Sequence, residues 1–308
     1  MQFGAQVNCY RTTWDNIALV VNTMEKGRWD SLWFADHYLP PPGRREDEGL
    51  PAHECFTLIS AAAILTTRMR LGPLVLGNPY RTPALVAKMA TPVDQISHGR
   101  FTLSIGAAWF KREHEAFGWK FPEMRERSDR LEEACQVLRM LLGADGPVDF
   151  NGQYYNLDQA QLAPGCYKER IPIMVGGTGE VRTLKTLAMY GDIFNLDGWA
   201  RGPMTLDYYH HKLSVLERHC ERVGRDPSEI RHTILMPVML TDDKDKAGNF
   251  IAARGLGEGT VAGPRQYCID RIGEFKQAGV DEIMFGGMIT EKIEQYQRFD
   301  DEVLSAFY

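Results

Sequence analysis

The chain has 308 residues, of which 44% are hydrophobic and 25% are charged, and its formal net charge is −6. This composition is typical of a globular protein with enough apolar material for a large core. The acidic balance argues against a nucleic-acid-binding protein. No apolar run approaches the roughly 18 residues of a membrane-spanning helix.

The sequence also predicts a cellular location. The stretch MQFGAQVNCYRTTWD lacks the charged and then apolar segments of a secretory signal. The six cysteines are scattered, with no CxxC spacing, which argues against a disulfide framework or a zinc site. We therefore expect a cytoplasmic protein that has reduced cysteines and no bound metal, and that has neither a nucleic-acid nor a membrane partner.

Strand and helix patterns alternate along the chain. Eight short runs rich in Val, Ile and Phe predict buried strands, at 3–7, 31–35, 71–76, 101–105, 172–175, 192–196, 233–240 and 282–285. Helical patterns lie between them, at 15–26, 56–66, 83–96, 125–142, 181–190, 206–223 and 264–278. Asp15 is a candidate N-cap for the first of these helices, and Gly279 is a candidate C-terminal stop for the last.

This alternation predicts a parallel sheet, because each parallel connection needs a crossover helix. Eight units predict an α/β fold closed into a (β/α)8 TIM barrel, with an open doubly wound sheet as the alternative. No interdomain linker is visible, so we expect one domain over 1–308 with an insertion at about 110–170, after the fourth strand. The insertion contains a long helix and a hairpin signal at 149–155, with Asn151-Gly152 at the turn.

Functional groups of such a barrel lie at the C-terminal ends of its strands. These ends are rich in glycine, asparagine and aromatic residues, whereas strong acids and bases are few. They include the segments 36–37, 77–81, 106–109, 176–180, 197–199 and 286–287. This composition favours a flat polar ligand that supplies the chemistry itself.

One of these strand ends is a glycine-rich turn. In IPIMVGGTGEVRTL, residues 176–179 lie between a strand and a helix that is predicted to begin near Val181. Free backbone N–H groups and the helix dipole favour a phosphate there, and a plain tight turn is the alternative. A nicotinamide dinucleotide site with Asp197 on the ribose is a weaker alternative, because GGTGEV lacks the third glycine of GxGxxG.

The second strand ends at Asp36 and His37. An imidazole suits proton transfer near neutral pH, whereas the structural alternative is a polar strand end at which Asp36 caps local backbone. A metal site is disfavoured, because His210 and His211 would point about 100° apart on a helix. The other histidines show no ligand spacing.

Several longer stretches carry a family resemblance. The most specific are WFADHY, RLGPLVLGNPYRTPALVAKMATPVDQISHGRFTLSIGAAW and FKREHEAFGWKFPEMRERSDRLEEACQVL, and FNGQYYNL, IPIMVGGTGEVRTLKTLAMYGD and AGVDEIMFGG match as well. Over nearly its whole length the chain resembles the luciferase-like monooxygenase superfamily. Within that superfamily it is similar to the coenzyme F420-dependent (deazaflavin) oxidoreductases. The resemblance implies a bacterial-luciferase-like barrel that holds coenzyme F420 or FMN in its mouth.

The resemblance also implies roles for individual residues. His37 would lie beside the reactive centre of the cofactor ring, with Asp36 next to it. Leu74 and Val75 would form a bulge at a non-prolyl cis peptide behind the ring, and Asn78 would lie just beyond it. The remaining implied cofactor contacts are Gly106, Ala107, Gly176, Gly177 and Thr178.

The segment after the fourth strand indicates the cofactor and the substrate. GAAW resembles the deazaflavin group, so coenzyme F420 is expected and FMN is the alternative. Members that oxidise sugar phosphates carry a glutamate where this chain has Ala108 and Trp109, which argues against that substrate class. Trp109 and Trp199 are expected in the substrate pocket, with core packing as the alternative for Trp109.

The resemblance implies hydride transfer with a small-molecule substrate, with His37 handling the accompanying proton, in a homodimer. An FMN monooxygenase, a nicotinamide dehydrogenase and an inactive flavin-binding relative are the alternatives. The glutamyl groups of coenzyme F420 would favour a basic rim, for which the candidates are Arg44, Arg45, Lys111 and Arg112.

Overall fold

The computed structural model describes residues 1–41, 49–199, 204–253, 255–256 and 260–308. In these residues a parallel sheet closes on itself, in the order β3-β2-β1-β12-β10-β9-β8-β5-β4. Its strands are β1 (Gln2–Gln6), β2 (Ser31–Phe34), β3 (Arg70–Pro73), β4 (Leu76–Gly77), β5 (Leu103–Gly106), β8 (Ile173–Gly176), β9 (Ile193–Asp197), β10 (Arg231–Leu240) and β12 (Glu282–Gly286). The predicted TIM barrel is confirmed.

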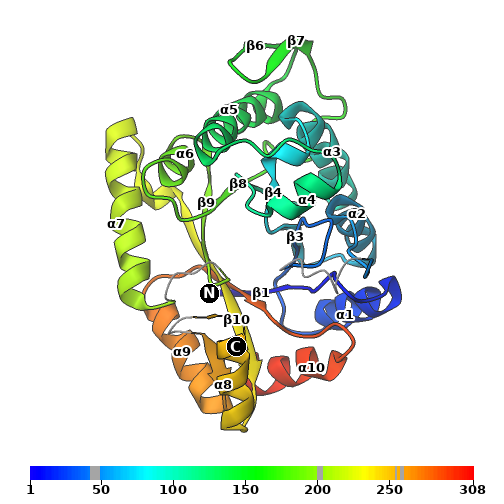
Figure 1. Cartoon of the computed structure of the whole chain (residues 1–308), viewed down its shortest axis with the longest axis vertical. Coiled ribbons are helices and arrows are strands. Elements are labelled where there is room, and N and C mark those ends of the chain that lie inside the picture. The colour runs from blue at the N-terminus through cyan, green and yellow to red at the C-terminus, as the bar shows by residue number, and fades with distance from the viewer. Residues whose placement is uncertain (42–48, 200–203, 254, 257–259) are drawn as a thin grey trace.

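Helices surround the barrel (Figure 1). They are α1 (Trp14–Lys26), α2 (Cys55–Leu65), α3 (Pro83–Ile96), α6 (Thr183–Tyr190), α7 (Leu206–Val223), α8 (Lys244–Ala253), α9 (Arg265–Gln277) and α10 (Ile293–Glu302), with short 3-10 turns η2 (Asn78–Tyr80), η3 (Pro227–Glu229) and η4 (Leu304–Phe307). The prediction did not include α8 and α10, whereas the bounds of α3 and α7 agree with it to the residue. Within the described part of the chain, none of the helices is long and apolar enough to cross a bilayer.

The third predicted strand, 71–76, is divided into β3 and β4. Between them the peptide bond from Leu74 to Val75 is cis, as the resemblance implies. β4 pairs in parallel with β5, and a single parallel bridge from Leu71 to Phe101 joins β3 to the chain just before β5. The barrel therefore closes along a seam between β3–β4 and β5, where few strand-to-strand hydrogen bonds form.

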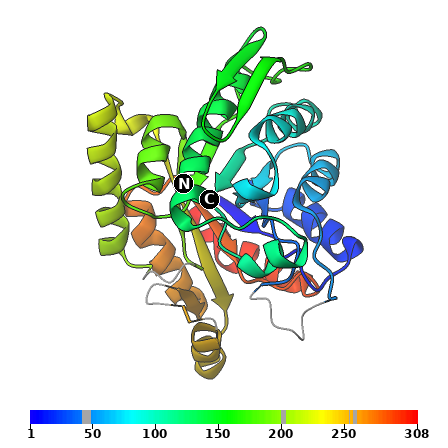
Figure 2. The same cartoon turned by 45° about the horizontal axis from the view of Figure 1, so that its top comes forward.

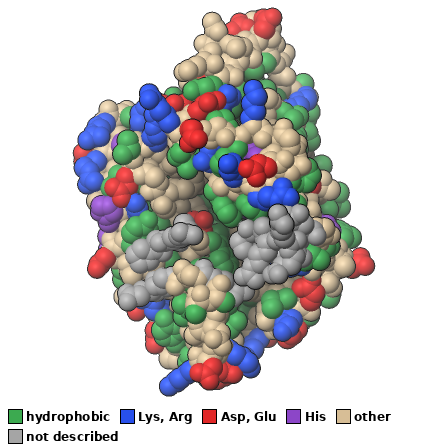
Figure 3. Space-filling view, viewed as in Figure 1, with side chains coloured by type: hydrophobic (Ala, Val, Ile, Leu, Met, Phe, Trp, Pro, Cys, Tyr) green, Lys and Arg blue, Asp and Glu red, His purple; other side chains and the backbone are tan. Residues whose placement is uncertain are grey.

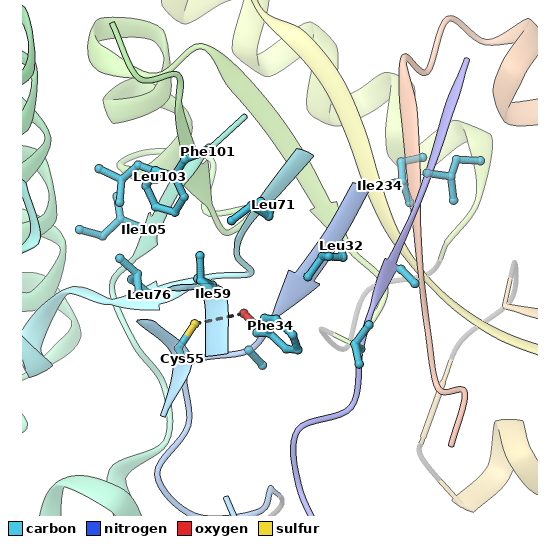
Figure 4. Close-up of a cluster of buried hydrophobic side chains, with 14 of the residues drawn as sticks. Leu32, Phe34, Cys55, Ile59, Leu71, Leu76, Phe101, Leu103, Ile105 and Ile234 are labelled. Atoms are coloured by element: carbon cyan, nitrogen blue, oxygen red, sulfur yellow. Dashed lines mark hydrogen bonds between the residues drawn. The ribbon is translucent and has the colours of Figure 1, made fainter. Parts of the chain in front are cut away.

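Two apolar cores follow from strand alternation, because successive side chains of a strand point to opposite faces. Leu32 and Phe34 of β2 pack outward with Ile59 of α2, where the Cys55 thiol donates to the Phe34 carbonyl oxygen at 3.5 Å (Figure 4). Trp33, between them in sequence, packs inside the barrel. Its neighbours there are Leu74, Met174, Ile193, Leu235 and Met284.

The insertion after β5 contains α4 (Lys111–Ala116), α5 (Met124–Gly143) and the antiparallel strands β6 (Val148–Asn151) and β7 (Asn156–Ala160). The predicted hairpin is thus present, with residues 152–155 as its turn, and it stands out from the barrel in both views (Figures 1 and 2). The division of the chain into domains stays a prediction.

Three local expectations need correction. Thr13, not Asp15, is the N-cap of α1, because its side chain accepts the Asn16 N–H while Asp15 lies in the first turn. The helix expected near Val181 begins at Thr183. The strand pattern did not predict β11 (Val261–Gly263), which pairs with the outer part of the ten-residue β10.

Candidate functional site

His37 lies just beyond the C-terminal end of β2, at the mouth of the barrel. Its side chain is 16% exposed. The imidazole Nδ1 lies 2.8 Å from Oε1 of Glu113, which comes from α4 in the insertion. The two partners are 76 residues apart in sequence, so the pair forms only when the segments after β2 and β5 meet.

Glu113 is fully buried and surrounded by donors. The backbone N–H groups of Tyr38 and Leu39 donate to its Oε2. The Tyr80 hydroxyl donates to its Oε1 at 2.8 Å. Burial, reinforced by the Glu113 carboxylate, raises the pKa of Tyr80 well above its ordinary value, so this hydroxyl remains a donor.

Asp36 does not contact His37, which corrects the expectation that it supports the imidazole. Its carboxylate forms a two-pronged ion pair with Arg81, at 2.9 and 3.0 Å, and accepts the Gly77 N–H at 3.0 Å. The physical reason is that adjacent residues on extended backbone point in opposite directions. Asp36 therefore acts structurally, by fixing the end of β2 to the start of η2.

Arg81 links three segments of the site. Besides Asp36, it donates to the Tyr38 hydroxyl and to Glu54, the residue that caps α2. Burial opposes the charge of this guanidinium, but Asp36, Tyr38 and Glu54 together outweigh the burial and raise the pKa of Arg81. This buried cation holds in place the loops that carry His37 and Asn78.

Aromatic rings enclose the His37 imidazole. The ring centroids of Trp109 and Phe110 lie 5.3 and 5.7 Å from it, both edge-on. Tyr10 lies 6.2 Å away on another side. Trp109 is 59% exposed and stacks on Phe110. Trp109 is thus not a core residue. It forms an exposed apolar surface beside His37.

Val75 forms a second wall, against strands β5 and β8. An added Cβ on Gly106 would come within 2.9 Å of the Val75 side chain, and one on Gly176 within 2.7 Å. Both positions therefore require glycine, because any side chain would displace Val75. On the far side of the barrel, Trp199 packs against the interior cluster, and its indole Nε1 is buried without a partner among the described residues.

Asn78 has an unpaired polar atom. Its side-chain amide contacts the Tyr155 hydroxyl at 3.1 Å through Nδ2, while Oδ1 is buried and finds no partner in the described part of the chain. Unpaired buried polar atoms are rare, since each costs about 1–3 kcal/mol. Asn78 Oδ1 is therefore free to accept a hydrogen bond.

The glycine-rich turn after β8 leaves backbone N–H groups without backbone partners among the described residues. Gly177 has φ +113°, which favours glycine. Among the described residues, the N–H groups of Thr178 and Gly179 have no backbone partner. Glu180, the next residue, is held on α7 by Lys212 at 2.5 Å and His211 at 2.9 Å.

The loop after β5 is held by a buried arginine. Arg127 of α5 donates to the carbonyl oxygens of Ala107 and Ala108, and Ala108 has φ +62°. Arg127 thus fixes the backbone that leads into Trp109.

Of the basic rim, Lys111 forms an exposed ion pair with Glu115 at 3.5 Å, whereas Arg44 and Arg45 lie outside the described residues. A search of the described part of the chain finds no cluster of three or more His, Cys, Asp or Glu side chains placed to hold a metal.

The structure brings His37, Val75, Gly106, Gly176 and Asn78 to the C-terminal ends of the barrel strands. The face of the molecule seen in Figure 3 is hollowed near its centre. Sequence reasoning missed Glu113, Arg81 and Arg127. KREHEA has the composition of a solvated helix, and the only local signal was that Glu113 lies within a stretch resembling the family.

The comparisons with known proteins agree with this architecture. The sequence profile of the family described as luciferase-like monooxygenase matches residues 2–249. An uncharacterized protein of Mycobacterium tuberculosis is 30% identical over 206 residues, which cover 67% of each chain. The F420-dependent glucose-6-phosphate dehydrogenase of Amycolatopsis mediterranei is 28% identical over 235 residues, covering 76% of this chain and 67% of the relative.

A solved structure resembles the whole chain. An F420-dependent secondary alcohol dehydrogenase in complex with an F420-acetone adduct superposes with a TM-score of 0.82 at 21% identity. The superposition covers 99% of this chain and 98% of that one. At this identity the likeness establishes the barrel fold.

Proposed function

Because the chain belongs to the luciferase-like monooxygenase family, we propose that it is an oxidoreductase that uses coenzyme F420 to move a hydride to or from a small organic substrate. The observation that carries the proposal is the His37 imidazole, enclosed by aromatic rings at the barrel mouth and bonded to protein through Nδ1. Its other nitrogen, Nε2, has no hydrogen-bond partner among the described residues and would be available for a substrate proton. Two relatives whose names state F420 dependence support the choice of cofactor.

The residues present fit a flat cofactor that carries a phosphate. Val75 would back the ring, with room for it provided by Gly106 and Gly176. Asn78 Oδ1, buried and unpaired, would accept from the ring or its side chain. Gly177 and Thr178 would hold the phosphate, and Ala107 would line the wall beside Gly106.

When bound, coenzyme F420 supplies the acceptor or donor of the hydride. The protein's own part is to orient the substrate, exclude water and move the proton. His37 Nε2 takes the substrate's proton during oxidation and returns it during reduction. Trp109 and Trp199 would wall the substrate, and their apolar surfaces suit a small neutral molecule.

The second candidate is an FMN-dependent monooxygenase, which the family's description favours. The same wall and glycine turn would accept FMN.

We also propose a cytoplasmic location, since the six cysteines are all unpaired and five of them are buried. Free thiols are typical of reducing compartments.

Fluorescence titration of the purified chain with coenzyme F420 and with FMN separates the two candidates. We expect saturable F420 binding and at least ~10-fold weaker FMN binding. Gly176→Val should weaken binding of either cofactor, because its side chain would displace Val75. Tight FMN binding without F420 binding would overturn the cofactor assignment.

Turnover can then be followed with oxidised F420 and a panel of small alcohols, and with reduced F420 and a panel of ketones. His37→Ala should lower kcat by about 10²–10⁴ while changing the affinity for F420 only slightly, because general acid–base catalysis contributes factors of that size. Unchanged turnover in His37→Ala would exclude the proton-transfer role.

A further inference from the structure

We infer that Glu113 is a positioning residue, which holds the His37 imidazole as its Nδ1–H tautomer so that Nε2 presents a lone pair to the substrate. This inference rests on the proposed role of His37 in proton transfer. It deepens that role by naming the group that prepares the imidazole for it.

The first step is the ionisation of Glu113. Four groups of the described residues contact its carboxylate. The N–H groups of Tyr38 and Leu39 can only donate, and they approach Oε2. The Tyr80 hydroxyl donates to Oε1. Because both contacts of Oε2 are N–H donors, the hydrogen of a neutral carboxyl would have to lie on Oε1, where the Tyr80 hydroxyl or the imidazole would then have to accept it. The carboxylate accepts from all of these groups without that rearrangement, so it is the form that matches the site.

The second step is the tautomer of His37. Its Nδ1 lies 2.8 Å from Oε1 of a carboxylate that can only accept. Nδ1 therefore carries the hydrogen, and in the neutral ring the lone pair lies on Nε2. The nearer acid in sequence, Asp36, cannot take this part because Arg81 and the Gly77 N–H occupy its oxygens.

The third step is the charge that develops during turnover. When Nε2 accepts a proton, the ring becomes an imidazolium with a buried carboxylate against its Nδ1. Two opposite charges in this geometry attract strongly, because little water lies between them. Glu113 therefore stabilises the proton-carrying state of His37 and orients the ring before the substrate arrives.

Glu113→Gln in the full chain tests the inference. In this variant the amide oxygen would accept the two backbone N–H groups, and the amide nitrogen would face His37 Nδ1. A donor at that position forces Nδ1 to accept, so the hydrogen moves to Nε2. Glu115→Gln is the matched control, because Glu115 lies on the same short helix with its side chain 54% exposed.

The direct readout is the pair of imidazole ¹⁵N chemical shifts of His37 in cofactor-free protein, at a pH where the ring is neutral. His37→Gln identifies the signals. We expect the Nδ1–H pattern in the unmodified chain and in Glu115→Gln, and the Nε2–H pattern in Glu113→Gln. An Nε2–H pattern in the unmodified chain would overturn the inference even if Glu113→Gln did not fold, and so would an unchanged pattern in a folded Glu113→Gln.

Kinetics with coenzyme F420 give the second readout. Glu113→Gln should lower kcat by about 10²–10⁴, as for loss of a working general base, with substrate KM and F420 affinity within about threefold. Tyr80→Phe removes one donor but keeps the carboxylate, so it should keep the tautomer. If His37→Ala retained turnover while Glu113→Gln still switched the tautomer, the proposed proton-transfer role of His37 would fail and the positioning role of Glu113 would stand.

Discussion

Asp36 and His37 are neighbours in sequence with separate partners in space. Asp36 binds Arg81, and His37 binds Glu113. A sequence predicts that both residues lie at a strand end, because the apolar run before them is plain. It cannot predict their partners, since these come from the residue after η2 and from α4 and depend on how distant loops meet. The role of each residue thus depends on a charged partner that is distant in the sequence.

His114, next to Glu113 on α4, is a buried imidazole. Its Nδ1 donates to the Lys120 carbonyl oxygen at 2.9 Å, and its ring stacks on Tyr80 with centroids 4.7 Å apart. Burial lowers the pKa of His114 from its ordinary 6.5. The unfolded chain therefore takes up a proton at a higher pH than the folded protein does.

The sign of the pH dependence follows from this difference. As the pH falls below about 6.5, the unfolded state binds more protons, so the free energy of unfolding decreases. Urea denaturation should show that the free energy of unfolding decreases between pH 7 and 5. The decrease with pH should be less steep in His114→Gln. Burial also lowers the pKa of His232. His232 should therefore account for part of the pH dependence that remains in His114→Gln. His210→Gln, on the exposed side of α7, should match the unmodified chain; an unchanged slope in His114→Gln would contradict the assignment.

At the scale of elements, the barrel strands were predictable and the insertion was only partly so. Apolar runs such as 282–285 predict strands because parallel barrel strands are buried on both faces. The division of the third strand at Leu74 and Val75 has no signal in composition, and it came from the resemblance alone. The hairpin was visible from Asn151-Gly152, but its contact with the site through Tyr155 depends on tertiary packing.

Glu133 of α5 fixes that hairpin. Its carboxylate accepts the N–H groups of Gln153, Tyr154 and Tyr155, at 3.0, 2.8 and 2.6 Å. Gly152 lies beside it, and an added Cβ there would come within 2.3 Å of Oε1, so the carboxylate would have to shift. The carboxylate thereby places the Tyr155 hydroxyl on Asn78.

Glu133→Gln should loosen the turn, because an amide cannot accept through both ends. We expect faster hydrogen exchange at 153–155, corresponding to about 1–3 kcal/mol of lost local stability, and F420 binding weakened severalfold through Asn78. Glu132→Gln is the control, since Glu132 pairs with Lys185 of α6 at 3.0 Å. Equal exchange rates in the two variants would show that Glu133 does not hold the hairpin.

At the scale of the whole molecule, the outer surface of the barrel carries an apolar region. α2, CFTLISAAAIL, has no charged residue and packs beside α3. Ile64 of α2 is 72% exposed and Leu85 of α3 is 50% exposed. A helix that is apolar on every side is usually covered, and we propose that a second copy of the chain covers it in a homodimer.

Light scattering coupled to size exclusion tests this proposal. The unmodified chain should elute as a dimer at micromolar concentration, and Ile64→Glu should shift it to a monomer, because a carboxylate would be buried in the interface. Val223→Glu, at the end of α7, is the control and should leave the dimer intact. A monomeric unmodified chain at every concentration would exclude the homodimer.

The barrel closes at the seam between β3–β4 and β5, where a single bridge and a two-residue strand replace a full ladder. Val75 lies at this seam and packs across it, against Gly106 of β5 and Gly176 of β8. A cofactor ring that rests on Val75 would contact the strands on both sides of the seam. Ligand binding and closure of the barrel must then favour each other, by thermodynamic reciprocity. The bound cofactor would then complete the barrel wall at the seam.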